Sequence, residues 1–143
     1  MAKESNLTQT TYRSPDKIPF PPRIYYNSQE GQSYEVHFAG SSLGDGNGNI
    51  HEGVISSLLD EAFARVAFQK FHTHYLFTAN LSIDFMDELK VDSFFLIHCQ
   101  LAINDKNYKA EIRAEVKEVD SGKVVANATG LFLVPKDKRH LIK

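Results

Sequence analysis

The longest patterned stretch of the chain runs from residue 44 to residue 71 and changes character in its middle. Its first part, GDGNGNIHEG, is rich in glycine and asparagine, and its second part, VISSLLDEAFARVAFQKF, repeats apolar residues at a helical period. At about 100° per residue, the apolar side chains of the second part fill more than half of the circumference. The pattern predicts a glycine-rich loop followed by a long helix that other elements cover on most sides.

Three of the charged residues in this apolar helix, Asp60, Glu61 and Arg65, lie in its middle. Glu61 and Arg65 are four residues apart, so we expect them to pair along the one seam of the helix that is left to water. Asp60 projects roughly 100–140° away from that seam. Because an unpaired carboxylate in such a place is costly, Asp60 is the most informative residue of the chain.

On both sides of the helix the period of the pattern is two. The stretch SYEVHFAG puts Tyr34, Val36 and Phe38 on one face and predicts a first strand. Four further strands are predicted after the helix, at residues 76–86, 94–103, 108–119 and 124–134. Short turns at residues 104–107 and 120–123 are suited to hairpins. In the last strand, Gly130 predicts a bulge or a close backbone approach.

The strand that follows the helix alternates most clearly. One of its faces is apolar and the other is polar. The apolar face carries Phe77, Ala79, Leu81, Ile83 and Phe85, and the polar face carries Thr78, Asn80, Ser82 and Asp84. The whole order is strand, helix, then four strands in antiparallel succession, which predicts an α+β domain with a curved sheet wrapped around the helix. Near-continuous apolar strands also predict a second subunit.

The remaining segments set the domain bounds and the compartment. Residues 1–23 are polar and then proline-rich, which predicts an extended or disordered segment before a single domain at residues 24–143. Cys99 is the sole cysteine, so no intrachain disulfide forms and a reducing compartment is expected. The N-terminus has no apolar core of a secretory signal, which favours an intracellular place, either cytoplasm or mitochondrion.

Composition excludes several classes of function. The chain is 42% hydrophobic and 24% charged, as in an ordinary globular protein, and no apolar run has membrane-spanning length. A net charge of −2 gives no general attraction to nucleic acid. The C-terminal Lys136, Lys138 and Arg139 are interpreted as a solvated tail. His72 and His74 lack further ligands at metal-binding spacing, so no metal site is predicted.

The stretch GDGNGNIHEGVISSLLDEA resembles the hotdog-fold acyl-CoA thioesterases, in the branch of the phenylacetate-pathway enzymes and the eukaryotic thioesterase superfamily members. Their signature is a glycine-containing loop, His-Gly-Gly, and an apolar helix with an Asp nine positions after the His. His51 and Asp60 have this spacing, whereas Glu52 stands in place of the first Gly. The resemblance extends over residues 34–134 and implies a hotdog fold of about five to six strands around one long central helix.

The resemblance also implies roles for individual residues. Asp60 is implied as the general base or the nucleophile, with Thr78 as the residue that bonds Asp60 or holds the water; the alternative is a plain strand-forming Thr78. The helix start at Glu52 and Gly53 offers N–H donors to a developing oxyanion, and the alternative there is an ordinary helix start. His51 is implied to orient the loop or approach the thioester carbonyl. Asp45 falls at a position where members of this family often carry a polar side chain that faces the water, and the stronger interpretation is a turn residue before Gly46.

The implied ligand is an acyl-CoA, without a separate cofactor because coenzyme A is part of the substrate. Its nucleotide is implied to lie near a hairpin turn. The predicted substrate contacts are Asp45, Asn80, Phe85, Lys106, Asn107 and Lys109. Hotdog proteins pair their sheets edge to edge, which implies a homodimer or a dimer of dimers with shared active sites. Two other readings stay open: a non-catalytic acyl-thioester binder or scaffold, and a hotdog dehydratase, against which the Asp60 spacing argues.

Overall fold

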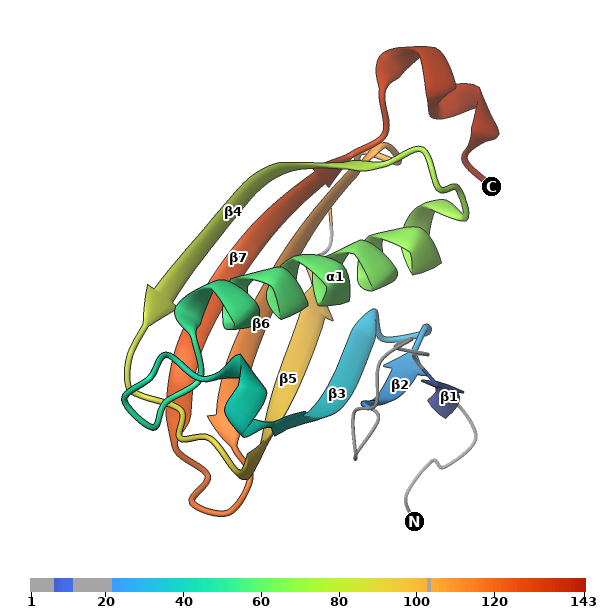
Figure 1. Cartoon of the computed structure of the whole chain (residues 1–143). Helices are drawn as coiled ribbons and strands as arrows, with labels where there is room; N and C mark the ends of the chain where they lie inside the picture. The colour runs from blue at the N-terminus through green and yellow to red at the C-terminus, as the bar shows by residue number, and fades with distance from the viewer. Residues whose placement is uncertain (1–6, 12–21, 103) are drawn as a thin grey trace.

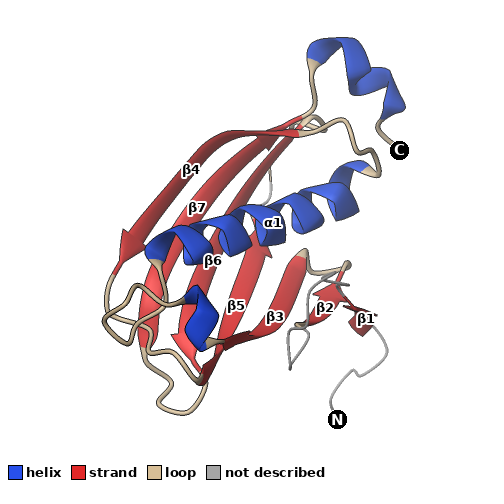
Figure 2. Ribbon diagram, in the orientation of Figure 1, coloured by secondary structure: helices blue, strands red, loops and turns tan. Residues whose placement is uncertain are grey.

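The structure, a computed structural model, describes residues 7–11, 22–102 and 104–143, so most of the proline-rich N-terminal segment lies outside the described residues. One long helix, α1 (Glu52–Phe71), lies along the concave side of a curved sheet (Figure 1). Two short 3-10 helices, η2 (Ser41–Leu43) and η3 (Lys136–Leu141), flank the domain at opposite ends (Figure 2). This is the predicted arrangement of one helix wrapped by one sheet.

The sheet has seven strands in the described part of the chain, in the order β1-β2-β3-β5-β6-β7-β4, with every neighbouring pair antiparallel. Their bounds are β1 Leu7–Thr11, β2 Arg23–Asn27, β3 Gln32–Ala39, β4 Phe77–Phe85, β5 Ser93–Leu101, β6 Lys109–Glu118 and β7 Val124–Leu133. The strands β1 and β2 were not among the predicted strands. The predicted antiparallel succession holds for β5, β6 and β7, but it is wrong for β4, which pairs with β7 at the far edge.

The helix begins beside the end of β4 and runs obliquely over the sheet toward β2 and β3, and the loop that follows it returns the chain to the start of β4 (Figure 1). The apolar side chains of the helix pack on the inward residues of β5, β6 and β7, which include Phe95, Ile112 and Phe132, all buried. The predicted close approach at Gly130 is confirmed. A Cβ atom there would lie 2.5 Å from the ring of Phe63, so only glycine admits the ring against β7.

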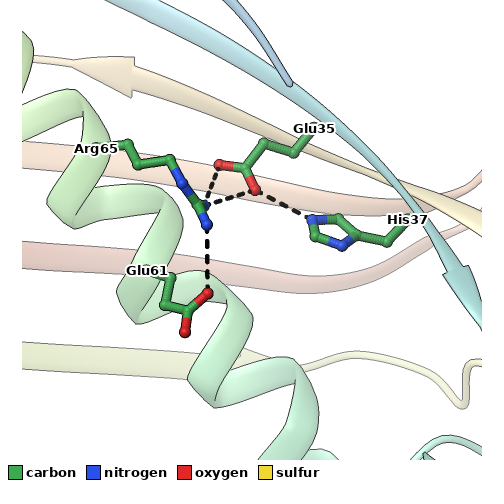
Figure 3. A network of polar contacts seen from close by, with 4 residues as sticks. All are labelled: Glu35, His37, Glu61 and Arg65. Atoms are coloured by element: carbon green, nitrogen blue, oxygen red, sulfur yellow. Dashed lines mark hydrogen bonds and ion pairs between the residues drawn. The ribbon is translucent and has the colours of Figure 1, made fainter. Parts of the chain in front are cut away.

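The face of β3 that meets the helix is polar, which the sequence pattern did not indicate. Ser33, Glu35 and His37 are buried, whereas the face of Tyr34, Val36 and Phe38 is only partly covered. Arg65 reaches down from the helix and places Nη1 3.0 Å from both carboxylate oxygens of Glu35 (Figure 3). The predicted pairing of Glu61 and Arg65 is present at 3.3 Å, but their seam faces β3 rather than water alone.

This ionic network fixes the helix against β3. The Glu35 side chain is fully buried. Besides Arg65, it contacts His37, whose Nε2 atom lies 3.1 Å from Glu35 Oε1 (Figure 3). A buried carboxylate is tolerated only while its partners remain in place, so the network restricts how far the helix can roll.

Replacing Arg65 with Met should therefore lower the free energy of unfolding by about 3–5 kcal/mol, because Glu35 keeps a buried charge without its cation. The double variant Glu35→Leu/Arg65→Met should recover most of that loss. Glu61→Gln, which removes an exposed pair, is the matched control and should cost less than about 1 kcal/mol. Urea unfolding measures the stability of all three variants. An Arg65→Met variant as stable as the wild type would refute the constraint.

Candidate functional site

The glycine-rich loop folds as a tight turn organised by Asp45. Its carboxylate oxygen Oδ1 accepts hydrogen bonds from the backbone N–H of Asn47 at 2.7 Å and of Asn49 at 3.3 Å. Gly46 and Gly48 have positive φ angles of 89° and 84°, which favours glycine at both. Asp45 thus has the turn role that the sequence left open, and its side chain also lies at the wall of the groove described below.

His51 caps the start of the helix. Its Nδ1 atom accepts a hydrogen bond of 2.8 Å from the Gly53 N–H. A Cβ atom on Gly53 would lie 2.9 Å from that nitrogen, which explains the glycine. The expectation of free donors at both Glu52 and Gly53 is therefore wrong for Gly53, because His51 occupies it. Among the described residues, the Glu52 N–H has no hydrogen-bond acceptor and remains the open donor at the positive end of the helix.

A groove of about 630 Å³ lies beside this helix start. The loop, the first helical turn and residues 85–89 form its walls, so that Asp45, His51, Glu52 and Phe85 share one cavity. The loop is tied to the far wall by the Ile50 N–H, which donates to the Leu89 carbonyl at 2.7 Å. Its lining is mixed, because it includes apolar Phe85 and Met86 as well as acidic Glu52 and Glu88.

Asp60 and Thr78 meet on the β4 side of the helix. The hydroxyl of Thr78 donates a hydrogen bond of 2.7 Å to Asp60 Oδ1, and Asp60 is partly buried. A β-bulge between Thr78 and Asn80 makes this contact possible, because Thr78 pairs with Phe132 while Leu81 pairs with Gly130. Strict alternation would put Thr78 and Leu81 on opposite faces, and the extra residue brings both to the helix side.

The other predicted contacts are dispersed. Asn80 pairs with Leu131 and so points to the convex face, away from Asp60. Lys106, Asn107 and Lys109 lie at the β5–β6 turn, at the opposite end of the helix from the groove. Within one chain the structure thus brings together Asp45, His51, Glu52, Gly53 and Phe85, and separately Asp60 and Thr78.

Asp60 lies far along the helix from the groove at the helix start. Asp60 is eight residues beyond Glu52, which corresponds to about 12 Å of helix rise. The β5–β6 turn is held near the helix end by Lys70, whose Nζ donates to the carbonyl oxygens of Lys106 at 3.0 Å and of Lys109 at 2.5 Å. Burial lowers the pKa of this ammonium group.

Sequence reasoning missed two parts of this surface. The groove wall at residues 86–89 follows a strand and has no period, so no pattern marked it. Lys70 looked like an ordinary polar residue in the last turn of the helix, and its three acceptors on the β5–β6 turn are visible only in three dimensions.

The chain belongs to the thioesterase superfamily, because residues 47–125 match the sequence profile of that family. This match spans the helix, β4, β5, β6 and the first residues of β7. It confirms the resemblance found in the loop and helix.

Three fungal proteins are similar in sequence. The UPF0644 protein PB2B4.06 of Schizosaccharomyces pombe is 27% identical over 95% of this chain and 55% of its own length. The MIOREX complex component 3 of Saccharomyces cerevisiae is 27% identical over 66% of this chain and 35% of its own. A mitochondrial protein of Candida albicans is 28% identical over 61% of this chain and 39% of its own length. The chain thus spans about half, or less, of the length of these relatives.

Solved structures of low sequence identity share the fold. The PaaI protein of the Escherichia coli phenylacetic acid degradation operon superposes with a TM-score of 0.66 at 20% identity, covering 74% of each chain. Zebrafish thioesterase superfamily member 2 superposes with a TM-score of 0.71 at 14% identity, covering 80% of this chain and 81% of its own. An acyl-CoA hydrolase of Staphylococcus aureus, in complex with butyryl coenzyme A, superposes with a TM-score of 0.69 at 16% identity, covering 78% of this chain and 67% of its own. The fold is therefore the predicted hotdog fold.

Two further properties of the described residues bear on the site. No group of three or more His, Cys, Asp or Glu side chains there is arranged to hold a metal ion. No helix in the part that the structure describes is long and apolar enough to cross a membrane.

The cap at His51 can be tested by stability. His51→Ala removes the acceptor of the Gly53 N–H and should lower the free energy of unfolding by about 1 kcal/mol. His51→Asn, which supplies another good N-cap, should restore most of it. Urea denaturation distinguishes the two. Equal stability of the Ala variant and the wild type would mean that the hydrogen bond does not cap the helix.

Proposed function

We propose that the protein is an acyl-CoA thioesterase, which hydrolyses the thioester of an acyl-CoA to a free acid and CoA. The observation that carries this proposal is the hydrogen bond between Thr78 and Asp60, a partly buried carboxylate held at one orientation on the helix. Membership of the thioesterase superfamily supports it. Further support comes from the similar fold of a protein named as an acyl-CoA hydrolase and solved with butyryl coenzyme A.

Asp60 has two possible roles in this reaction. As a general base it takes a proton from water, whose oxygen attacks the thioester carbon. As a nucleophile it attacks that carbon itself and forms a mixed anhydride, which water then hydrolyses. On both routes the carbonyl oxygen becomes an oxyanion, the carbon–sulfur bond breaks, and CoA leaves with the sulfur. On either route, the hydrogen bond from the Thr78 hydroxyl to Oδ1 orients the Asp60 carboxylate.

The oxyanion needs a donor, and the Glu52 N–H is the open one at the helix start. It lies beside the 630 Å³ groove, whereas Asp60 lies about 12 Å further along the same helix. One chain therefore separates the donor from the base. We propose that two chains complete each site, with the donor from one subunit and Asp60 and Thr78 from its partner.

The edge strand β4 is the proposed dimer contact. It has a neighbour on one side only, and Phe77, Phe85 and Met86 along this edge are 46%, 37% and 62% exposed. An exposed apolar sheet edge is normally covered in a stable protein. Antiparallel pairing of β4 with its copy about a two-fold axis would bring the Phe77 end of one subunit beside the Phe85 end of the other. A dimer of dimers is compatible with the same contact.

A non-catalytic acyl-thioester binder is the second candidate, and Glu52 favours it. This residue begins the helix with an exposed carboxylate at the groove wall, where other family members have glycine in the resemblance described above. Negative charge beside a developing oxyanion opposes hydrolysis. As for the compartment, one relative is named as mitochondrial, and we propose a mitochondrial, intracellular location.

Turnover of a panel of acyl-CoA substrates, followed with a thiol reagent, tests the proposed activity. Asp60→Asn should lower kcat by a factor on the order of 10² or more, because it removes the base or nucleophile and keeps the shape. Asp84→Asn on the outward face of β4 is the matched control and should retain kcat. Cys99 does not interfere, because burial raises the pKa of its thiol to about 12.

The outcomes of that panel differ between the candidates. An Asp60→Asn variant with more than half of the wild-type rate would exclude Asp60 as the catalytic group. A wild-type chain that binds acyl-CoA and releases no thiol would establish the binder instead.

Glu52 can be tested by two substitutions. Glu52→Gln removes only the charge, and Glu52→Gly matches the family pattern. Both should preserve or raise kcat/KM, by about two- to fivefold, because up to ~1 kcal/mol of repulsion of the oxyanion disappears. Steady-state kinetics on the best substrate of the panel gives the answer. A loss of more than tenfold in both variants would assign Glu52 a catalytic role.

A further inference from the structure

The C-terminal segment is packed against the domain and is not the solvated tail that the sequence suggested. The Arg139 guanidinium lies 3.5 Å from the ring centre of Tyr108, and its Nε donates to the Val134 carbonyl at 3.2 Å. The Lys138 ammonium lies 4.8 Å from the ring centre of Tyr75. Because Tyr75 lies two residues before β4, Lys138 is held near the start of that strand.

These cations belong to a larger group of basic residues at one end of the molecule (Figure 1). We call this group the basic end, and it comprises residues 70–76, 104–109 and 136–143. Lys70 joins the first two segments through the Lys106 carbonyl at 3.0 Å, and Arg139 joins the last two over Tyr108. With His neutral, seven Lys and Arg side chains against two Asp side chains give the basic end a net charge of +5.

The other end of β4 is acidic. The acidic end, as we call it, comprises residues 45–52, 84–92 and 118–123. The first two segments line the groove together, and Lys123 of the third lies 3.5 Å from Asp87. Eight Asp and Glu side chains against two Lys side chains give it a net charge of −6. Because β4 spans nine residues, roughly 30 Å separates these opposite charges.

Within one chain the groove at the acidic end lacks a compensating cation. Four carboxylates line it, from Asp45, Glu52, Asp87 and Glu88, and no Lys or Arg is among the described residues of its wall. Asp45 accepts from its own loop, and Asp87 pairs with Lys123 outside the lining. Within the described part of the chain, the exposed carboxylates of Glu52 and Glu88 have no hydrogen bond or ion pair. The same chain therefore leaves both charges uncompensated.

The basic end has cations available for such carboxylates. Lys136 is exposed, and its ammonium group has no ion pair among the described residues. Lys138 has no ion pair there either, and the Tyr75 ring beside it is 52% exposed. Because the ring already holds the Lys138 ammonium, a new contact loses less side-chain entropy.

The proposed β4 contact aligns the two ends. In an antiparallel pair about a two-fold axis, Phe77 of one subunit lies beside Phe85 of the partner subunit. Tyr75 precedes Phe77 by two residues, and Glu88 follows Phe85 by three. Lys138, over Tyr75, is therefore level with Glu88 of the partner subunit. The two-fold axis repeats this contact, so each dimer has it twice.

We propose that the basic end of each subunit binds the acidic end of a second copy, with Lys136 and Lys138 facing Glu88 at the wall of the partner's groove. This inference rests on the β4 dimer of the proposed function and adds an ionic contact that fixes its orientation. Unlike ends attract in the antiparallel pair, whereas a parallel pair would place like ends together. The cations also offset the charge of Glu52, which opposes a developing oxyanion in the same groove. Each subunit thus supplies positive charge to the site of its partner.

A charge swap tests this contact without any substrate. Glu88→Lys and Lys138→Glu each convert two attractive contacts per dimer into two repulsive ones, so each should raise the Kd of the dimer on the order of tenfold or more. The double variant Glu88→Lys/Lys138→Glu restores opposite charges and should return the Kd to within about threefold of the wild type. Sedimentation equilibrium measures all of these constants. Added salt should weaken the wild-type dimer more than the dimer of either single variant.

Two matched controls carry the same changes of charge far from β4. Glu30→Lys in the β2–β3 turn and Arg23→Glu on β2 should leave the Kd within about twofold of the wild type, because four strands lie between β2 and β4. Thermal melting verifies the fold of each variant. If Lys138→Glu unfolds the chain, Lys136→Glu replaces it, because this exposed side chain has no partner within the described residues. That variant should raise the Kd by about three- to tenfold.

The outcomes separate the ionic contact from the enzymatic activity. Single variants that dimerise as tightly as the wild type, a double variant no tighter than the single ones, or a wild-type chain that stays monomeric would overturn the proposal. A dimer that responds to the swap as expected and hydrolyses no acyl-CoA would refute the proposed activity alone. An active enzyme whose Kd does not respond to these charges would refute the ionic contact alone.

Discussion

The rotation of α1 about its own axis is the constraint on which the rest of the structure depends. On one flank Arg65 binds the buried Glu35 of β3, and on the other flank Asp60 accepts from Thr78 of β4. These positions are about 140° apart around the helix, and β3 and β4 lie on opposite sides of it. A roll that kept one contact would break the other, so the ionic network and the Asp60–Thr78 hydrogen bond define a single orientation.

That orientation also determines which backbone N–H group at the helix start is open to the groove. His51 closes over the Gly53 N–H, and the Glu52 N–H faces outward beside the groove. The donor and Asp60 are then separated by two turns of one helix, and the neighbouring edge strand β4 is open and carries exposed apolar side chains. A catalytic group and its oxyanion donor have to lie within a few ångströms of one carbonyl. The proposal of a shared site follows from this separation together with the open edge.

Much of the fold was predictable because its signals are local. The change of period from 3.6 to 2 gave the helix and five of the strands, and the spacing from His51 to Asp60 gave the family. The contact of Asp60 with Thr78 came from the family resemblance, since alternation alone puts Thr78 on the wrong face and the bulge at Ala79 is not visible in the pattern.

The remainder depends on tertiary partners. The inward face of β3 carries Glu35 and His37. Their polar side chains predict a solvent-facing position, and only the contact of Arg65 with Glu35 in three dimensions explains their burial. β4 pairs with β7 and not with β5, which follows it in the chain, so its place in the sheet depends on contacts distant in sequence. The C-terminal lysines and arginine looked like a tail, and the rings of Tyr75 and Tyr108 that hold two of them come from distant parts of the sequence.

The central claim is that two chains build each thioesterase site, and mixed dimers test it most directly. Asp60→Asn removes the proposed catalytic carboxylate, and Gly53→Val displaces the His51 ring and blocks the helix start, so each variant alone should be inactive. Refolded together with two different tags, half of the dimers are mixed, and each has one intact site and one with both defects. The account predicts that roughly a quarter of the wild-type activity returns. Mixed dimers that are isolated through both tags and have no activity would contradict it.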